Sequence, residues 1–132
     1  MKKILSISFV VVALLFNSCS NGQNKSGKTN LSATEFAAKI KEIPTAPVVD
    51  VRSAEEYSSG HLQGSKNINW NGENFESEIV KLDKTKPVFV YCQSGRRSAA
   101  AANRMRSLGF KEVYELDGGI SSWVHANLPT TD

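Results

Sequence analysis

The sequence has few cysteines and no apolar run long enough to cross a bilayer as a helix. Cys19 and Cys92 are the two cysteines among 132 residues, which excludes a fold built on several disulfides. The longest apolar stretch, from Ile4 to Phe16, is interrupted by two serines. A transmembrane helix needs about 20 apolar residues, so this stretch suits the apolar part of an export signal better than a membrane span.

A strongly basic surface is also missing. The 16 Lys and Arg residues oppose 13 Asp and Glu residues, and two of the basic ones, Lys2 and Lys3, lie in a segment that we expect to be removed. This balance gives no indication of nucleic-acid binding. The hydrophobic fraction of 40% and the charged fraction of 22% are ordinary for a globular domain, and about 100 residues can bury a hydrophobic core.

The N-terminus resembles a bacterial lipoprotein signal. Met1 to Lys3 is basic, the apolar stretch follows, and Leu15-Phe16-Asn17-Ser18-Cys19 resembles a lipobox. The resemblance implies that residues 1–18 are a signal peptide and that Cys19 becomes the acylated N-terminus, which anchors the protein to a membrane. An ordinary cleaved signal is the alternative. We expect residues 19–32 to form the lipidated end and a flexible tether, with the protein in a bacterial cell envelope, facing the periplasm or on the outer membrane.

Residues 33–131 predict one α/β domain. Ser32 with Glu35, and Ser53 with Glu56, form capping boxes that begin helices. Apolar patterns predict five helices, at residues 33–40, 54–59, 75–82, 98–108 and 120–127. Short β-branched or apolar runs predict strands at residues 48–51, 67–69, 88–91 and 113–116. This alternation indicates a mainly parallel central sheet flanked by helices on both faces.

Three segments lie at the carboxyl ends of predicted strands and should meet at one edge of the sheet. They are Asp50-Val51-Arg52, the loop that starts at Cys92, and Asp117-Gly118-Gly119. In parallel α/β folds, ligands bind beyond the carboxyl ends of the strands. We therefore expect the functional site at this edge.

The loop Cys92-Gln93-Ser94-Gly95-Arg96-Arg97 connects a predicted strand to a predicted helix. A turn of this kind directs backbone N–H groups inward and forms an anion-binding nest, to which the helix N-terminus adds partial positive charge. Together with the two arginines, these groups favour the thiolate of Cys92 over the thiol. If Cys19 is acylated, Cys92 is left as a free thiol, which suggests either intermolecular pairing or chemistry. The alternative is an inert buried cysteine beside arginines on a solvated helix start.

Four segments of the sequence form one pattern when they are taken in order. They are Asp50-Val51-Arg52 with Glu55-Glu56-Tyr57, the run Gly60-His61-Leu62-Gln63-Gly64-Ser65-Lys66-Asn67-Ile68, the loop from Cys92 to Ser98, and Leu116-Asp117-Gly118-Gly119 with Trp123. Together these segments resemble the rhodanese-like (sulfurtransferase) family. Leu62 and Ser65 stand where the family usually has Ile and Ala. The resemblance implies a single rhodanese-like domain over residues 33–131.

The resemblance further implies that Cys92 is the nucleophile and carries sulfur as a persulfide. The donor would be a small sulfur anion such as thiosulfate, and the acceptor cyanide or a thiol, with no metal or organic cofactor. The backbone of the loop would cradle the persulfide, Arg97 with Arg96 would attract the donor, and Asp50 and Arg52 would brace the rim. The cradle comprises Gln93, Ser94, Gly95, Arg96, Arg97 and Ser98. A monomer is the expected state.

Other residues and functions remain as alternatives. We expect His61 to be structural and not to form a dyad with Cys92, Trp123 to be a core residue, and Trp70 either to line the edge of the site or to cover the sheet. A phosphatase with a similar loop needs an arginine six positions after the cysteine, where this sequence has Ser98. A sulfur-relay or redox thiol facing a protein, or a binding module on the same fold, are the other candidates.

Overall fold

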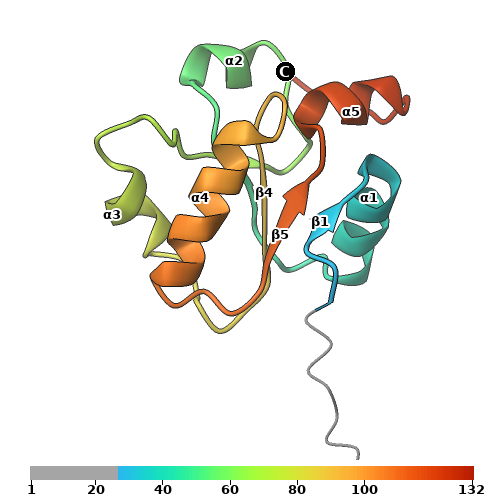
Figure 1. Cartoon of the computed structure of the whole chain (residues 1–132). Helices are drawn as coiled ribbons and strands as arrows, with labels where there is room; N and C mark the ends of the chain where they lie inside the picture. The colour runs from blue at the N-terminus through green and yellow to red at the C-terminus, as the bar shows by residue number, and fades with distance from the viewer. Residues whose placement is uncertain (1–26) are drawn as a thin grey trace, which may run out of the picture.

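The computed structural model describes residues 27–132 (Figure 1), and five parallel strands form its centre. The predicted signal peptide and Cys19 lie outside the described residues. The strands are β1 (Asn30–Leu31), β2 (Val48–Asp50), β3 (Lys66–Asn67), β4 (Val88–Tyr91) and β5 (Val113–Leu116). They lie in the order β1-β5-β4-β2-β3, so β4, which leads directly into Cys92, is the middle strand.

Five helices connect the strands. They are α1 (Ala33–Glu42), α2 (Ala54–Ser58), α3 (Phe75–Ile79), α4 (Arg96–Ser107) and α5 (Gly119–His125). Both predicted capping boxes are confirmed: the hydroxyls of Ser32 and Ser53 each accept a hydrogen bond from the backbone of the glutamate three residues later. None of the helices among the described residues is long and apolar enough to span a membrane.

Several predicted boundaries differ from the observed ones. Residues 19–32 were assigned to a tether, but Asn30 and Leu31 form β1, because they pair with β5 at the edge of the sheet. The helix expected from Ser98 begins at Arg96, because Gly95 acts as its N-cap. The helix expected to reach Leu82 ends at Ile79. The weak strand expected at residues 67–69 is a two-residue strand, β3, at the opposite edge.

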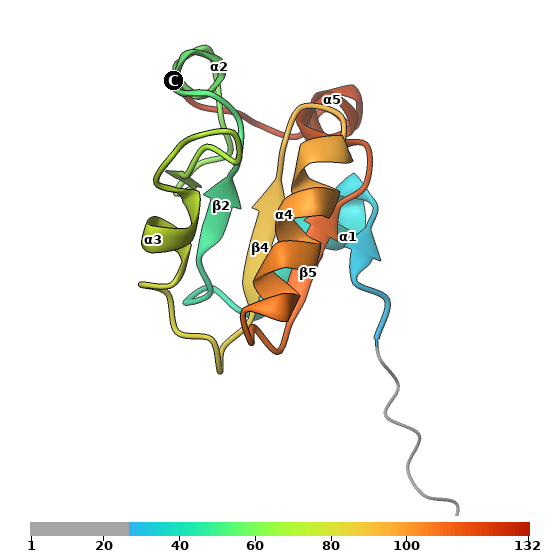
Figure 2. The same cartoon turned by 60° about the vertical axis from the view of Figure 1, so that its left-hand side comes forward.

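Each face of the sheet has its own hydrophobic core, as expected for helices on both sides. Ile79 from α3 and Met105 from α4 pack on one face with alternate residues of β4. On the other face, Phe36 of α1 meets Phe89 and Trp123 edge to face, with ring centroids 5.2 and 6.4 Å away. Figure 2 shows α4 in front of the sheet and α1 behind it. These two cores hold β4 at the centre of the domain.

The carboxyl ends of the strands point towards α2 and α5, which lie at the same end of the domain in both views (Figures 1 and 2). The N-terminus of α5 packs directly on the cysteine loop. The amide of Ile120 donates to the carbonyl of Cys92 at 2.9 Å, and the amide of Ser121 donates to the carbonyl of Gln93 at 3.2 Å. These bonds fix the backbone of the loop from outside, so that its remaining N–H groups turn inward.

Gly119 makes this close approach possible. Its φ is +64°, and a Cβ there would fall 2.5 Å from the carbonyl oxygen of Cys92. Gly64 has a similar φ of +77° but has no atom within 4 Å of the position of a Cβ. A comparison of alanine substitutions at Gly64 and Gly119 therefore separates the cost of backbone strain from the cost of steric collision.

We predict that Gly119→Ala destabilises the protein far more than Gly64→Ala. Left-handed strain costs about 1–2 kcal/mol, which both variants incur, and forced overpacking adds roughly 1–3 kcal/mol at Gly119 alone. Urea unfolding of both variants measures the difference. Equal destabilisation would contradict the assigned contact between α5 and the cysteine loop.

Candidate active site

The sulfur of Cys92 lies at the centre of a ring of hydrogen-bond donors. Cys92 directly follows β4 and is fully buried. Its Sγ accepts hydrogen bonds from the amides of Gly95 at 3.1 Å and Ser98 at 3.3 Å. Gly95 has a φ of +101°, which turns the chain sharply into α4 and lets both amides reach the same atom. The segment from Cys92 to Ser98 thus encloses the sulfur and directs two backbone amides at it.

The side chain of Ser98 completes this environment. Its hydroxyl is buried, accepts a hydrogen bond from the thiol of Cys92 at 3.4 Å and donates to the carbonyl of Gly95 at 3.1 Å. When the thiol ionises, the hydroxyl can turn its hydrogen towards the sulfur instead. Burial raises the pKa of the Cys92 thiol, but the hydroxyl of Ser98 and the amides of Ser98, Gly95 and Ser94 outweigh it, so that the net pKa is lowered. A lowered thiol pKa increases the fraction of reactive thiolate at neutral pH.

The two arginines of the loop differ in their surroundings. Both lie in the first turn of α4. The guanidinium of Arg97 makes a two-pronged ion pair with the carboxylate of Glu56 on α2, at 2.7 and 2.8 Å. Arg96 is exposed and makes no ion pair with the described residues. The sequence suggested Arg97 as the main donor-binding cation, whereas in the structure Arg96 is the one with an unpaired charge.

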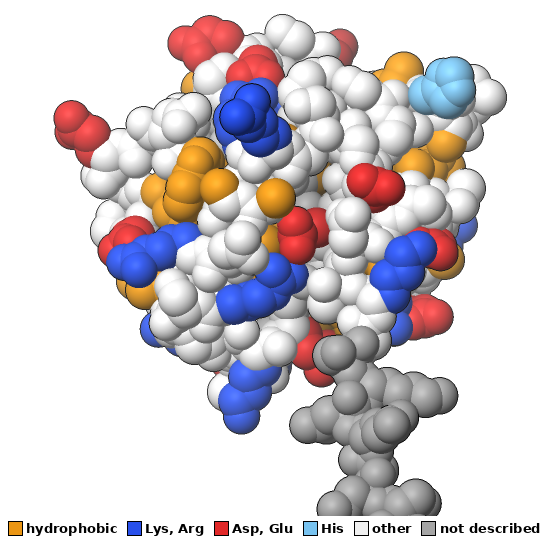
Figure 3. All heavy atoms as spheres, in the orientation of Figure 1, with side chains coloured by type: hydrophobic (Ala, Val, Ile, Leu, Met, Phe, Trp, Pro, Cys, Tyr) orange, Lys and Arg blue, Asp and Glu red, His pale blue; other side chains and the backbone are white. Residues whose placement is uncertain are grey.

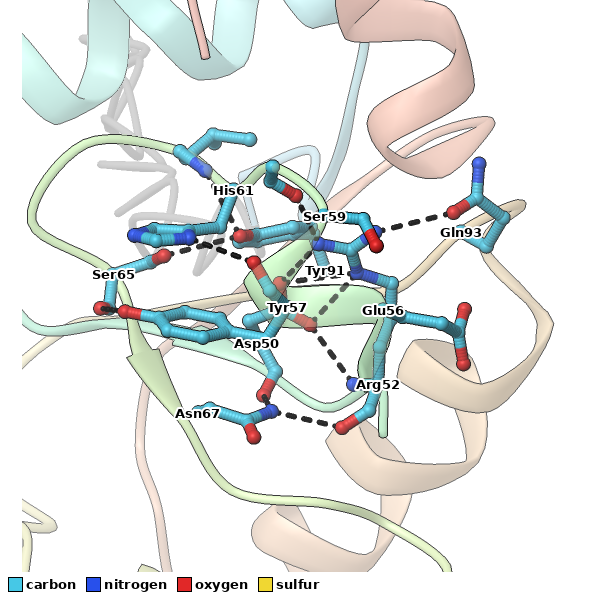
Figure 4. A network of polar contacts seen from close by, with 12 residues as sticks. Asp50, Arg52, Glu56, Tyr57, Ser59, His61, Ser65, Asn67, Tyr91 and Gln93 are labelled. Atoms are coloured by element: carbon cyan, nitrogen blue, oxygen red, sulfur yellow. Dashed lines mark hydrogen bonds and ion pairs between the residues drawn. The ribbon is translucent and has the colours of Figure 1, made fainter. Parts of the chain in front are cut away.

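A buried ion pair supports the rim beside the loop (Figure 4). The guanidinium of Arg52 binds the carboxylate of Asp50 through Nε and Nη2, at distances of 2.7 to 3.0 Å. It also donates to the carbonyl of Gly60 at 2.7 Å and to the side-chain oxygen of Gln93 at 3.2 Å. The side-chain nitrogen of Gln93, Nε2, in turn donates to the hydroxyl of Ser121 at 3.0 Å. Arg52 therefore connects β2, the segment after α2 and the cysteine loop.

This arrangement of a cysteine, a strand-to-helix turn and a supporting Asp-Arg pair agrees with the comparison to known protein families. Residues 32–126 match the rhodanese-like domain. The chain belongs to the rhodanese-like family.

Two relatives are named thiosulfate sulfurtransferase GlpE. The protein from Shewanella oneidensis is 36% identical over 89 residues, which cover 67% of this chain and 86% of that protein. The protein from Coxiella burnetii is 39% identical over 104 residues, which cover 79% and 91%.

Solved structures support the same assignment. A rhodanese-related protein from Thermoplasma volcanium superposes with a TM-score of 0.68 at 28% identity, covering 79% of this chain and 98% of that one. A rhodanese-like domain from Anabaena gives a TM-score of 0.70 at 26% identity, covering 80% of each chain. The single parallel-sheet domain expected from the sequence is therefore the rhodanese-like fold.

A hollow of about 370 Å³ opens beside the cysteine loop of the rhodanese-like domain. Its lining combines charged, polar and apolar side chains from α2, the loop and α5, among them Arg52, Glu56, Gln93, Ile120, Ser121 and Val124. Val124 is 55% exposed, which gives the hollow an apolar edge. The hollow is much larger than one sulfur atom, so it has room for the body of a substrate.

The remaining residues singled out in the sequence have structural surroundings. The ring of His61 stacks on Tyr57 at 3.7 Å, and its Nδ1 lies 2.8 Å from the carbonyl of Tyr57, so it makes no dyad with Cys92. Trp123 is a buried core residue, as expected. Trp70 covers the sheet, where it packs edge to face on Phe75. His125 is exposed in the last turn of α5.

Sequence reasoning missed two features of the site. The sequence predicts Glu56 as the third residue of a capping box and as part of the Glu-Glu-Tyr segment, and the structure shows that its carboxylate also binds Arg97. The sequence predicts Gly119 at the edge of the sheet and in the motif that ends at Trp123, and the structure shows that it allows α5 to contact the cysteine loop. No local pattern in the sequence indicates either contact.

We predict that Ser98→Ala raises the pKa of Cys92, because it removes the hydroxyl beside the sulfur. Titration of the thiolate by its ultraviolet absorbance, against Cys92→Ser as the blank, measures this without a reagent that must enter the site. Ser94→Ala is the matched control, since Ser94 contributes only its backbone amide. An unchanged titration in Ser98→Ala would contradict the role of the hydroxyl.

The lowered pKa of Cys92 also makes the stability of the protein depend on pH. In the unsubstituted protein the thiolate stabilises the folded state at pH values above the ordinary thiol pKa, and this stabilisation is lost as pH falls through the pKa of the folded state.

Proposed function

We propose that the protein is a sulfurtransferase that carries sulfane sulfur as a persulfide on Cys92. The observation that supports this most directly is the sulfur of Cys92 at hydrogen-bond distance from the amides of Gly95 and Ser98. This arrangement stabilises a sulfur anion. The names of two relatives, thiosulfate sulfurtransferase, support the same reaction class.

The proposed reaction has two displacement steps. The thiolate of Cys92 attacks the outer sulfur of thiosulfate; a new S–S bond forms, the S–S bond of the donor breaks, and sulfite leaves with the electron pair. Cyanide or a thiolate then attacks the outer sulfur of the persulfide. The S–S bond to Cys92 breaks, the thiolate is regenerated, and the sulfur leaves as thiocyanate or as a new persulfide.

The loop has unused donors for the added sulfur. The amides of Arg96 and Arg97 open α4 and donate to no backbone carbonyl among the described residues. We propose that they bind the outer sulfur of the persulfide, next to the amides of Gly95 and Ser98 that already contact Cys92. At the sixth position after the cysteine, where a phosphatase needs an arginine, Ser98 is buried against the sulfur. These features favour transfer of sulfur over hydrolysis of phosphate.

Burial of Cys92 constrains how a donor reaches it. The residue has no exposed surface, so reaction requires the loop or the exposed side chains around it to move aside. The attacked atom must also be the small terminal atom of the donor. The outer sulfur of a sulfane donor meets this requirement, whereas a protein disulfide is much bulkier. We therefore favour sulfur transfer over disulfide exchange as the use of this thiol.

We further propose that the domain works at a bacterial membrane surface, held by acyl chains on Cys19. The support for this is the lipobox-like sequence, which lies outside the described residues. The donor would be a small anionic sulfur compound and the acceptor a thiol, and the cell envelope would be the place of reaction.

Intact mass spectrometry of the protein after incubation with thiosulfate tests the proposed reaction. We expect a gain of about 32 Da, one sulfur atom, on the unsubstituted protein and no gain on Cys92→Ser. Subsequent addition of cyanide should remove the added mass and release thiocyanate. Retention of the gain in Cys92→Ser would contradict Cys92 as the carrier. No gain on a protein whose Cys92 still reacts with a thiol reagent would contradict thiosulfate as a donor.

A further inference from the structure

The carboxylate of Glu56 is fixed from two sides. As the third residue of α2 it accepts hydrogen bonds from the amide of Ser53 at 3.4 Å and from the hydroxyl of Ser53 at 3.2 Å. It then reaches across to α4 and binds both terminal nitrogens of Arg97. The capping box thus holds Glu56 in place before any ligand arrives, and its pairing with Arg97 joins α2 to the cysteine loop.

Glu56 is ionised at neutral pH. The hydrogen bonds from Arg97 lower the pKa of its carboxyl to about 2, and the bonds from Ser53 contribute in the same direction. The carboxylate also lines the hollow beside the loop. A ligand that enters the hollow therefore meets a permanent negative charge, on a carboxylate that is paired with an arginine of the cysteine loop.

The charges around the hollow cancel in pairs. Arg52 is paired with Asp50, and Arg97 is paired with Glu56, which leaves Arg96 as the loop cation without a carboxylate partner among the described residues. Figure 3 shows acidic and basic side chains interspersed on the visible face, without a large area of one sign. Attraction of an anion therefore depends on the balance of these few charges.

We infer that Glu56 is a specificity-determining residue of the sulfur site: its carboxylate neutralises Arg97 and so limits the preference of Cys92 for anionic partners. This inference deepens the proposed function and rests on it for the nature of the reaction. Among anionic sulfur donors, the site therefore favours those of low negative charge: a sulfane sulfur on an organic molecule whose body contacts the apolar edge of the hollow at Ile120 and Val124. A small dianion can react, but Glu56 opposes its approach.

A pair of alkylating reagents of nearly equal size measures this charge effect directly. Iodoacetate is anionic and iodoacetamide is neutral, and both react with the same thiolate. In the ratio of their rate constants, the effects of the thiolate fraction and of access to the loop therefore cancel. In Glu56→Gln we expect the iodoacetate-to-iodoacetamide ratio to rise about threefold to tenfold at low salt, because the negative charge that neutralises Arg97 is removed and Arg97 interacts electrostatically with Cys92. The rise should shrink as ionic strength increases.

Glu55→Gln is the matched control. It makes the same change of charge one residue away, at an exposed position without an ion pair among the described residues, and should leave the ratio unchanged. Glutamine at position 56 retains the capping box, because Gln serves as well as Glu at that place in the motif. A thermal unfolding curve for each variant checks that both remain folded.

Sulfur transfer gives a second readout of the same inference. The KM for thiosulfate should fall severalfold in Glu56→Gln, with kcat changed much less, and should not fall in Glu55→Gln. A ratio of alkylation rates that stays the same in Glu56→Gln, or that rises equally in both variants, would overturn the inference. Because alkylation needs no sulfur donor, a changed ratio without any persulfide would support the role of Glu56 while contradicting the proposed function.

Discussion

The convergence of backbone N–H groups on the sulfur of Cys92 is the interaction on which the rest of the site depends. It requires β4 to end at a fixed point, which the two hydrophobic cores on either side of the strand ensure. It also requires the sharp turn at Gly95 and the amides of α5 that bind the outer side of the loop. The charge of the thiolate is thus stabilised mainly by backbone amides of the loop and by one serine hydroxyl.

The arginines have a different role from that of the amides. Arg52 and Arg97 are each paired with a carboxylate, and both pairs join the cysteine loop or its helix to the segments around α2. Paired in this way, they hold the rim together more than they attract ligands, since each positive charge is cancelled at short range. Arg97 still contributes to the potential at the sulfur, and Glu56 determines how much of that contribution an approaching anion meets.

Much of the fold and the identity of the nucleophile could be predicted from the sequence. The serines that cap α1 and α2, the apolar run of β4 and the Cys92 loop are local patterns with local causes. The pairing of Glu56 with Arg97 could not be predicted, because it joins residues 41 positions apart and because the capping box already accounted for the glutamate. Strand β1 was missed for a similar reason: Asn30 is a polar residue that becomes a strand only by pairing with β5.

A crystal structure of the protein after treatment with thiosulfate would show where the transferred sulfur is held. We expect a second sulfur bonded to the Sγ of Cys92 and lying within hydrogen-bond distance of the amides of the loop, including those of Arg96 or Arg97 at the start of α4. A second sulfur that points away from these amides into the hollow would contradict the claim that the main chain of the loop holds the transferred atom. So would a loop that refolds and releases the sulfur from the amides of Gly95 and Ser98.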